Sequence, residues 1–230
     1  MRVALMLTDS VRARIWNIAN SYYSKGDWAH DKNHVERVVR TAIEIGKREN
    51  ADLDVIELAA ILHDISEYKE YHSKIEAFRH EVQGAIEAMR ILKKLGMASN
   101  TIEAVAHCIE AHRKRASVEP RTIEAKCLFD ADKLDAIGAI GIIRSAFISF
   151  DHGQEFYKEE DIDAYRRRNI RPDGRITDPS LHSSNLEYEL SLKAIPNRMY
   201  TKTGKRLAKD RAAFMDEFYD RIGKELKAFH

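Results

Sequence analysis

Apolar residues recur at intervals of three and four along almost the whole chain, which is the pattern of amphipathic helices. Only four prolines and ten glycines interrupt this pattern in 230 residues, so we predict an all-α fold. Helices are expected to begin after the capping sequence at residues 8–10, near residues 30–33, after Asp52 and at His80. Gly96 is expected to end the helix that begins at His80.

The helix that begins at His80 is predicted to bury an apolar stripe of Val82, Ala85, Ile86, Met89 and Leu92. His80 itself lies off that stripe. The next helix, expected over residues 100–113, carries His107 and His112, which are five residues and about 140° apart. They cannot both face inward. Because His112 shares the buried side with Ile109, it is the candidate for an active-site residue.

Further helices are predicted over about 124–149, 186–195 and 204–229, the last as an amphipathic helix that seals the domain. Between the first two, residues 151–184 are polar, charged and rich in turn-forming residues. We therefore predict a poorly structured loop insertion there. The length fits one domain, 1–230, that contains this insertion.

Composition narrows the classes of partner. The 38 Lys and Arg residues nearly balance the 37 Asp and Glu residues, so no overall field favours a nucleic acid polymer. The apolar run at residues 3–7 is too short for a signal peptide, and no segment approaches membrane-spanning length. Cys108 and Cys127 lack CxxC spacing and fit a reducing compartment. We expect a cytoplasmic protein that binds neither nucleic acid polymers nor membranes, and leave a homodimer open.

A histidine and an aspartate stand side by side at the end of an apolar helix, as His63 and Asp64. Adjacent helical side chains point about 100° apart, so the pair can bind one cation only near a helix end, with further ligands from other helices. His34 and Asp132 carry suitable chemistry, and two imidazoles with two carboxylates suit a divalent ion. An isolated His-Asp dipeptide also occurs by chance, and a histidine satisfied by a carbonyl is the simpler interpretation of His34 alone.

The order of these residues and the segments around them resemble the HD superfamily of metal-dependent phosphohydrolases. The matching segments are residues 30–38 (HDKNHVERV), 62–65 (LHDI), 109–113 (IEAHR) and 130–141 (DADKLDAIGAIG). The chain looks most like the bacterial branch that includes nucleoside triphosphate pyrophosphohydrolases. The resemblance extends from about residue 26 into the C-terminal helix.

The resemblance implies one divalent ion bound by His34, His63, Asp64 and Asp132. It selects Asp132 from an acidic run that also contains Asp130 and Asp135. Mn²⁺ is the first choice of metal, and Mg²⁺, Co²⁺, Fe²⁺, Ni²⁺ and Zn²⁺ are alternatives. It also implies that histidines in the positions of His80 and His112 bind a second metal or contact substrate phosphates.

Two carboxylates are the catalytic candidates. Asp64 belongs to the metal site itself, and Glu67 follows it within one helical turn. From there Glu67 could orient or deprotonate an attacking water. The alternative is that Glu67 is a solvated surface residue.

Cationic side chains near these segments could bind phosphate. Arg37 lies one turn after His34 and Lys133 is next to Asp132, although a surface ion pair explains Arg37 equally well. Arg168 and Arg171 in the insertion could close over a substrate as part of a lid, or belong to a solvated run of charges.

The resemblance implies hydrolysis of a small-molecule phosphate ester, with a nucleoside triphosphate cleaved to monophosphate and pyrophosphate as the first expectation. A phosphomonoesterase or a cyclic-nucleotide phosphodiesterase could use the same site. Outside the enzymes, the alternative is a nucleotide-sensing module that keeps the metal but has no catalytic activity.

Overall fold

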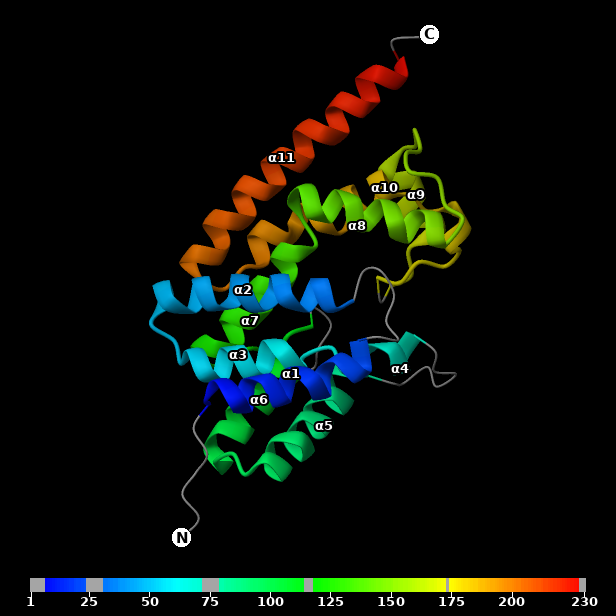
Figure 1. Ribbon diagram of the computed structural model, residues 1–230. Helices are drawn as coiled ribbons and strands as arrows, with labels where there is room; N and C mark the ends of the chain where they lie inside the picture. Colours follow the sequence, from blue (N-terminus) through cyan, green and yellow to red (C-terminus); the bar gives the residue numbers. More distant parts are fainter. Residues whose placement is uncertain (1–6, 24–30, 72–78, 114–117, 173, 228–230) are drawn as a thin grey trace. The chain divides into compact units, whose positions relative to one another are not determined.

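The computed structural model describes residues 7–23, 31–71, 79–113, 118–172 and 174–227. Within these residues the regular elements are helices, and the β-type pairings are two isolated bridges (Figure 1). The fold is therefore all-α, as the spacing of apolar residues predicts. None of the described helices is long and apolar enough to cross a membrane.

Backbone contacts divide the chain into two compact units, and the boundary falls inside a helix. The first unit contains Met1–Asp132 and Tyr200–Gly204, and the second contains Lys133–Met199 and Lys205–His230. The prediction of a single domain over the whole chain stays a prediction.

The first unit is a helical bundle with α3 at its centre (Figure 1). Its helices are α1 (Asp9–Tyr23), α2 (Lys32–Glu49), α3 (Leu53–Leu62), α4 (Glu67–Tyr71), α5 (His80–Leu95), α6 (Ser99–Ala111) and most of α7 (Ile123–Asp135). Helix α3 contacts α1, α2 and α6, and α5 packs on α6. Seven of the ten residues of α3 are buried, and His63 and Asp64, which follow its end, are buried too.

The starts and ends of the core helices follow their capping residues. The side chain of Asp31 accepts a hydrogen bond from the backbone N–H of His34 at 2.9 Å and caps α2. Asp52 caps α3 in the same way, and Gly96 ends α5 in the left-handed conformation with φ +82°. These three helix limits confirm the sequence predictions.

The buried face of α5 differs from the predicted one. Ile86 and Met89 are 39% and 40% exposed, whereas His80 and Gly84 are buried. A Cβ atom added at Gly84 would lie 3.3 Å from the carbonyl oxygen of His63. Helix α5 therefore lies close to the backbone of His63 at this small residue. This close approach turns His80 inward, and the prediction that it lies off the buried face is wrong.

The second unit contains α8 (Gly138–Asp151), α9 (Ile162–Asn169), α10 (Ser184–Leu190), most of α11 (Lys202–Lys227), and the 3₁₀ helices η1 (Pro179–Leu181) and η2 (Leu192–Arg198). Helix α10 contacts α8, α9 and η2. The helix predicted over 186–195 is therefore two shorter elements, α10 and η2.

The predicted single helix over 124–149 is also two helices. Between α7 and α8, Ile137 is extended and Gly138 has a φ of +78°. Glycine adopts this left-handed conformation at little cost, and a Cβ atom at Gly138 would lie 3.0 Å from the Cγ atom of Arg211. The chain therefore changes direction inside a run that reads as one helix.

Residues 151–184 are more ordered than predicted. They contain α9, and Tyr165 on that helix is fully buried. Its hydroxyl lies 2.8 Å from Nδ1 of His182 and accepts a hydrogen bond from Nδ2 of Asn169 at 2.8 Å. A buried polar network of this kind fixes the segment, so the prediction of poor structure is wrong.

Candidate metal centre

Two buried histidines terminate two core helices in the same way. His63 is the C-cap of α3 and His112 is the C-cap of α6. Nδ1 of His63 donates to the carbonyl of Ala60 at 2.8 Å, and Nδ1 of His112 donates to the carbonyl of Ile109 at 2.6 Å. Carbonyls in the last turn lack an intrahelical partner, and a carbonyl can only accept. In each neutral ring, Nε2 therefore carries the lone pair that can bind a metal.

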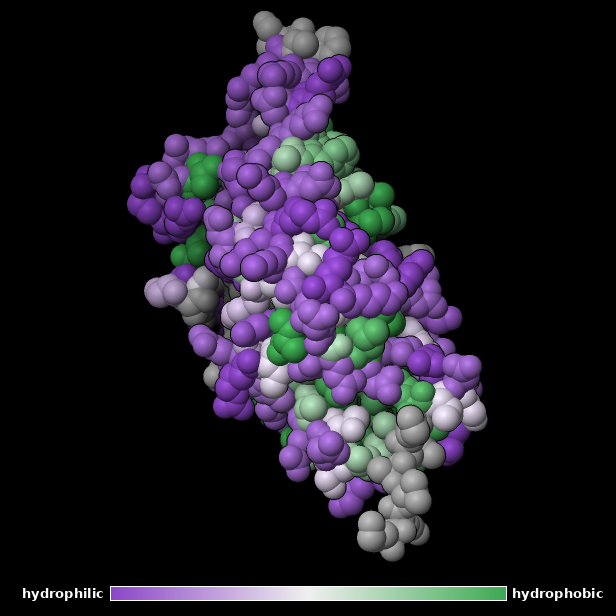
Figure 2. Space-filling model, turned by 90° about the vertical axis from the view of Figure 1, so that its left-hand side faces the viewer, coloured by the Kyte–Doolittle hydropathy of each residue, from purple (hydrophilic) through white to green (hydrophobic). Residues whose placement is uncertain are grey.

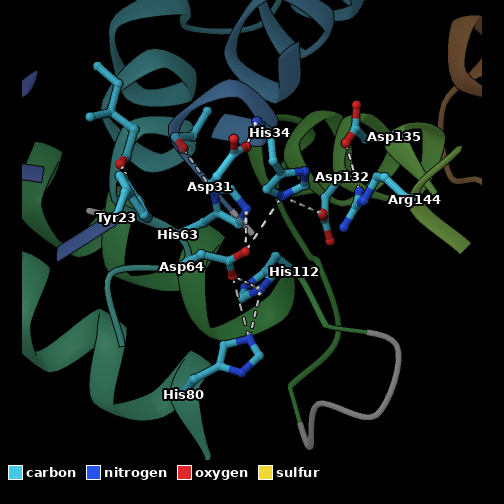
Figure 3. A network of polar contacts seen from close by, with 12 residues as sticks. Tyr23, Asp31, His34, His63, Asp64, His80, His112, Asp132, Asp135 and Arg144 are labelled. Atoms are coloured by element: carbon cyan, nitrogen blue, oxygen red, sulfur yellow. Dashed lines mark hydrogen bonds and ion pairs between the residues drawn. The ribbon is translucent and has the colours of Figure 1, made fainter. Parts of the chain in front are cut away.

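The carboxylate of Asp64 lies among four histidines (Figure 3). Its Oδ2 atom is 3.2 Å from Nε2 of His63 and 3.5 Å from Nε2 of His34. Its Oδ1 atom is 3.4 Å from Nε2 of His112 and 3.6 Å from Nε2 of His80. The two oxygens of one carboxylate thus face two different pairs of imidazoles.

Asp132 completes the first of two groups of ligand atoms. Its Oδ1 atom lies 3.6 Å from Nε2 of His34. Within each group the ligand atoms lie no more than 4.8 Å apart. One group is His34, His63 and Asp132, and the other is Asp64, His80 and His112. The four predicted ligands and the two predicted flanking histidines therefore lie together in the first unit.

Asp130 has a structural role in the fold. It is fully buried and accepts hydrogen bonds from the backbone N–H groups of Tyr200 and Thr201 at 2.9 and 2.8 Å. The hydroxyl of Thr201 donates to it at 2.7 Å. The carboxylate thus holds the start of α11.

Asp135 also has its own partner. Its Oδ2 atom accepts a hydrogen bond from Nη1 of Arg144 at 2.7 Å. Of the three acidic residues near the end of α7, Asp132 is the one that belongs to a group of possible metal ligands among the described residues.

The electrostatics of the site favour a cation. Burial opposes a charge on His63, but the carboxylates of Asp64 and Asp132 raise its pKa to about 9. Burial also opposes ionisation of Asp64, yet the histidines around it lower its pKa well below the usual value. Nε2 of His63 is buried and makes no hydrogen bond among the described residues. Two negative carboxylates beside the Nε2 atom of a buried imidazole are ligand types that bind a divalent metal ion.

Three other residues are predicted to act beside the metal ligands, and they lie near those ligands along the chain. Glu67 begins α4, and its backbone N–H donates to the carbonyl of Asp64 at 3.0 Å. Arg37 follows His34 by one turn of α2, and Lys133 is near the end of α7. All three side chains are half-buried, and their roles stay predictions.

The arginines of the predicted lid belong to the second unit. Arg168 forms an ion pair with Glu160 at 2.7 Å, and its guanidinium lies 5.9 Å from the ring centroid of Tyr165. Arg171 is exposed. A lid role for these residues stays a prediction.

Sequence reasoning did not find a cavity of about 380 Å³ in the second unit. Its walls include Arg144 and Ser149 on α8, and Ile176, His182 and Glu187 from later segments. One face of α8 supplies part of the wall at helical spacing, and the other wall residues come from segments that only folding brings to it.

Residues 32–137 match the family model of the HD domain, and this range holds every residue of the two ligand groups. These residues therefore match an HD domain, and a metal-dependent phosphohydrolase is the class of enzyme that this match and the ligand groups support. A divalent ion belongs to this class of site.

Relatives of nearly equal length support this class. The chain is 29% identical to YpgQ of Bacillus subtilis (strain 168) over 224 residues, which are 96% of this chain and 95% of YpgQ. A crystal structure of YpgQ in complex with ADP matches with a TM-score of 0.68 and 26% identity, covering 93% of this chain and 94% of that one. An HD superfamily hydrolase from an uncultured Thermotogales bacterium matches with a TM-score of 0.63 and 28% identity, covering 93% and 92%.

Proposed function

We propose that this phosphohydrolase acts on nucleotides and cleaves a nucleoside triphosphate to monophosphate and pyrophosphate, with Mn²⁺ as the metal. The ligands would be His34, His63, Asp64 and Asp132. The observation that supports the proposal most directly is the carboxylate of Asp64 among four histidines. A nucleotide ligand is supported by YpgQ, a relative along almost the whole chain, which has been crystallised with ADP.

The protein would hold its ligands in place before metal and substrate arrive. The ring of His63 is fixed by its hydrogen bond to the carbonyl of Ala60. The backbone N–H of His34 donates a hydrogen bond to the side chain of Asp31, which caps α2. A divalent ion, when bound, polarises a phosphoryl oxygen and lowers the pKa of water. Ligands that are already oriented need little rearrangement on binding.

In this proposal Glu67 accepts a proton from the attacking water. A bond forms between that water oxygen and the α-phosphorus, and the bond from the α-phosphorus to the bridging oxygen breaks as pyrophosphate leaves. Arg37 and Lys133 would neutralise the phosphate charges, since guanidinium and ammonium groups stabilise developing negative charge.

A second group of ligand atoms favours a variant of this site with two ions. Asp64, His80 and His112 place three ligand atoms within 4.8 Å of one another. Nε2 of His80 and Nε2 of His112 are 3.3 Å apart, close enough to share one cation. The alternative for these two histidines is direct contact with substrate phosphates. The number of tightly bound ions per chain separates the two possibilities.

A panel of phosphate esters tests the proposed reaction. We expect pyrophosphate release from nucleoside triphosphates with Mn²⁺, and less with Mg²⁺ or Co²⁺. Inorganic phosphate from monophosphates would identify a phosphomonoesterase, and ring opening of cyclic nucleotides would identify a phosphodiesterase. Nucleotide binding without turnover by the metal-loaded protein would identify a sensing module. Each of these three results would contradict the proposed reaction.

Glu67→Gln tests the proposed proton acceptor. The amide keeps the size of the side chain but cannot accept the proton, so we expect kcat to fall by roughly 10²-fold or more. Metal content should stay at the wild-type value, because Glu67 is not in either ligand group. Lys69→Gln, an exposed change on the same short helix, is the control. Full kcat in Glu67→Gln would remove this role.

A further inference from the structure

The cavity of about 380 Å³ in the second unit has the size of a small-molecule site. Most of its lining is apolar, and Ile148, Ile176 and Leu192 contribute to it from three separate segments. On the face of the molecule in Figure 2, hydrophilic residues predominate and hydrophobic residues form small patches. A concave wall that is mainly apolar differs from such a surface and is suited to cover the apolar body of a ligand.

A chain of buried hydrogen bonds ends at a carboxylate in this wall. The backbone N–H of Asp178 can only donate, and it donates to Oδ1 of Asn169 at 2.8 Å, so the other amide atom is the NH₂ group. This group donates to the hydroxyl of Tyr165 at 2.8 Å, and that hydroxyl donates its own hydrogen to Nδ1 of His182 at 2.8 Å. Nε2 of the neutral imidazole then carries a hydrogen and donates to Oε2 of Glu187 at 3.1 Å.

Glu187 differs from the other charged residue of the wall, Arg144, in having no partner of opposite charge. Nη1 of Arg144 lies 2.7 Å from the carboxylate of Asp135. Among the residues that the structure describes, the carboxylate of Glu187 pairs with the neutral ring of His182 and with no Lys or Arg side chain. Its side chain is 37% exposed, so a ligand can reach it.

Two further polar side chains of the wall are already bonded to the backbone. Nε2 of Gln154 donates to the carbonyl of Pro179 at 2.8 Å, and Nδ1 of His152 donates to the carbonyl of Ile148 at 2.8 Å. These bonds use donors that would otherwise attract an anionic ligand. The polar group of the wall that most favours one sign of charge is therefore the carboxylate of Glu187.

We propose that this cavity binds a small organic cation, whose ammonium or amidinium group pairs with Glu187 and whose apolar body lies against the apolar wall. Hydrogen bonds between such a cation and a carboxylate are roughly twice as strong as those between neutral groups. Because His182 holds one oxygen of the carboxylate, the side chain loses little freedom when a ligand binds. The proposal is independent of the proposed nucleotide reaction, since none of the described residues in the wall belongs to the two groups of metal ligands.

Three ring compounds of nearly equal shape test the charge preference of the cavity. Benzamidine is a cation, benzamide is neutral and benzoate is an anion. Titration calorimetry of the full, metal-loaded chain at neutral pH should give a Kd for benzamidine on the order of 0.1–1 mM, as expected for a ligand of this size. Benzamide and benzoate should bind at least about 10-fold more weakly, because neither brings a positive charge to Glu187.

Glu187→Gln locates the bound cation. Glutamine can still accept the hydrogen bond from His182, so the variant should fold, and its thermal transition without ligand checks this. Loss of the charge should raise the Kd for benzamidine at least about 10-fold. Glu189→Gln removes an exposed carboxylate of the same helix outside the wall, and this matched control should bind benzamidine like the wild type.

Equal affinities of the wild type for the three compounds would overturn the proposal, and so would a folded Glu187→Gln variant with the wild-type Kd for benzamidine. Failure of the wild type to bind benzamidine at concentrations up to about 10 mM would also overturn it. Displacement of benzamidine by uncharged nucleosides that bind more tightly would make the ligand a neutral heterocycle, which likewise contradicts the proposal.

Discussion

Replacing Asp64 with asparagine should abolish both metal binding and hydrolysis. Asparagine has nearly the same shape, but it loses the negative charge and one of the two oxygens that face the histidines. Metal activation of phosphoryl transfer is worth several kcal/mol, so we expect kcat/KM to fall by roughly 10³-fold or more. Bound metal, measured by elemental analysis of the purified protein, should fall below the detection limit.

Two controls make this result specific. Asp54→Asn changes an exposed aspartate on α3, the helix that ends just before His63 and Asp64, and should keep full metal content. His107→Ala removes a histidine that lies outside both ligand groups, and should also keep it. If Asp64→Asn retained wild-type metal occupancy, the site described around Asp64 would be wrong.

Variants of the two ligand groups also count the ions. With one ion, His63→Ala should release it, whereas His80→Ala should retain it and lower substrate affinity. With two ions, His80→Ala should lower the metal content from two per chain to one. The same series therefore decides between the one-ion site and its two-ion variant.

The helical class and several helix limits could be predicted from the sequence because their causes are local. Apolar spacing defines the helices, and Asp52 and Gly96 mark helix limits by their own chemistry. The pair of His63 and Asp64 stands at a helix end, where adjacent side chains can meet ligands from other helices. The structure places His34 near both residues, and the roles of the four residues as metal ligands stay predictions.

The parts that could not be predicted depend on distant contacts. His80 is turned inward by the approach of Gly84 to the backbone of His63, which no spacing within α5 reveals. The turn at Gly138 interrupts an apolar run that has the composition of a helix. The order in residues 151–184 comes from the buried hydroxyl of Tyr165, whose partners a polar sequence does not identify.

Distant contacts also explain why Asp130 has a structural role and Asp132 does not. The hydrogen-bond partners of Asp130 are 70 and 71 residues away in the sequence. This difference leads to a prediction in which two neighbouring aspartates have opposite effects. Asp130→Asn loses charge-assisted hydrogen bonds to Tyr200 and Thr201, so we expect the free energy of unfolding to fall by about 3 kcal/mol. Metal content of the folded protein should be unchanged.

Asp132→Asn should do the reverse. Its side chain is 13% exposed and belongs to the ligand group with His34, so metal binding and turnover should be lost while stability measured without metal changes little. Urea denaturation with excess chelator measures stability, and elemental analysis measures metal. Because each variant is the control for the other, the two measurements must separate them. Metal loss in a fully stable Asp130→Asn variant, or a destabilised Asp132→Asn variant that keeps its metal, would reverse the two assignments.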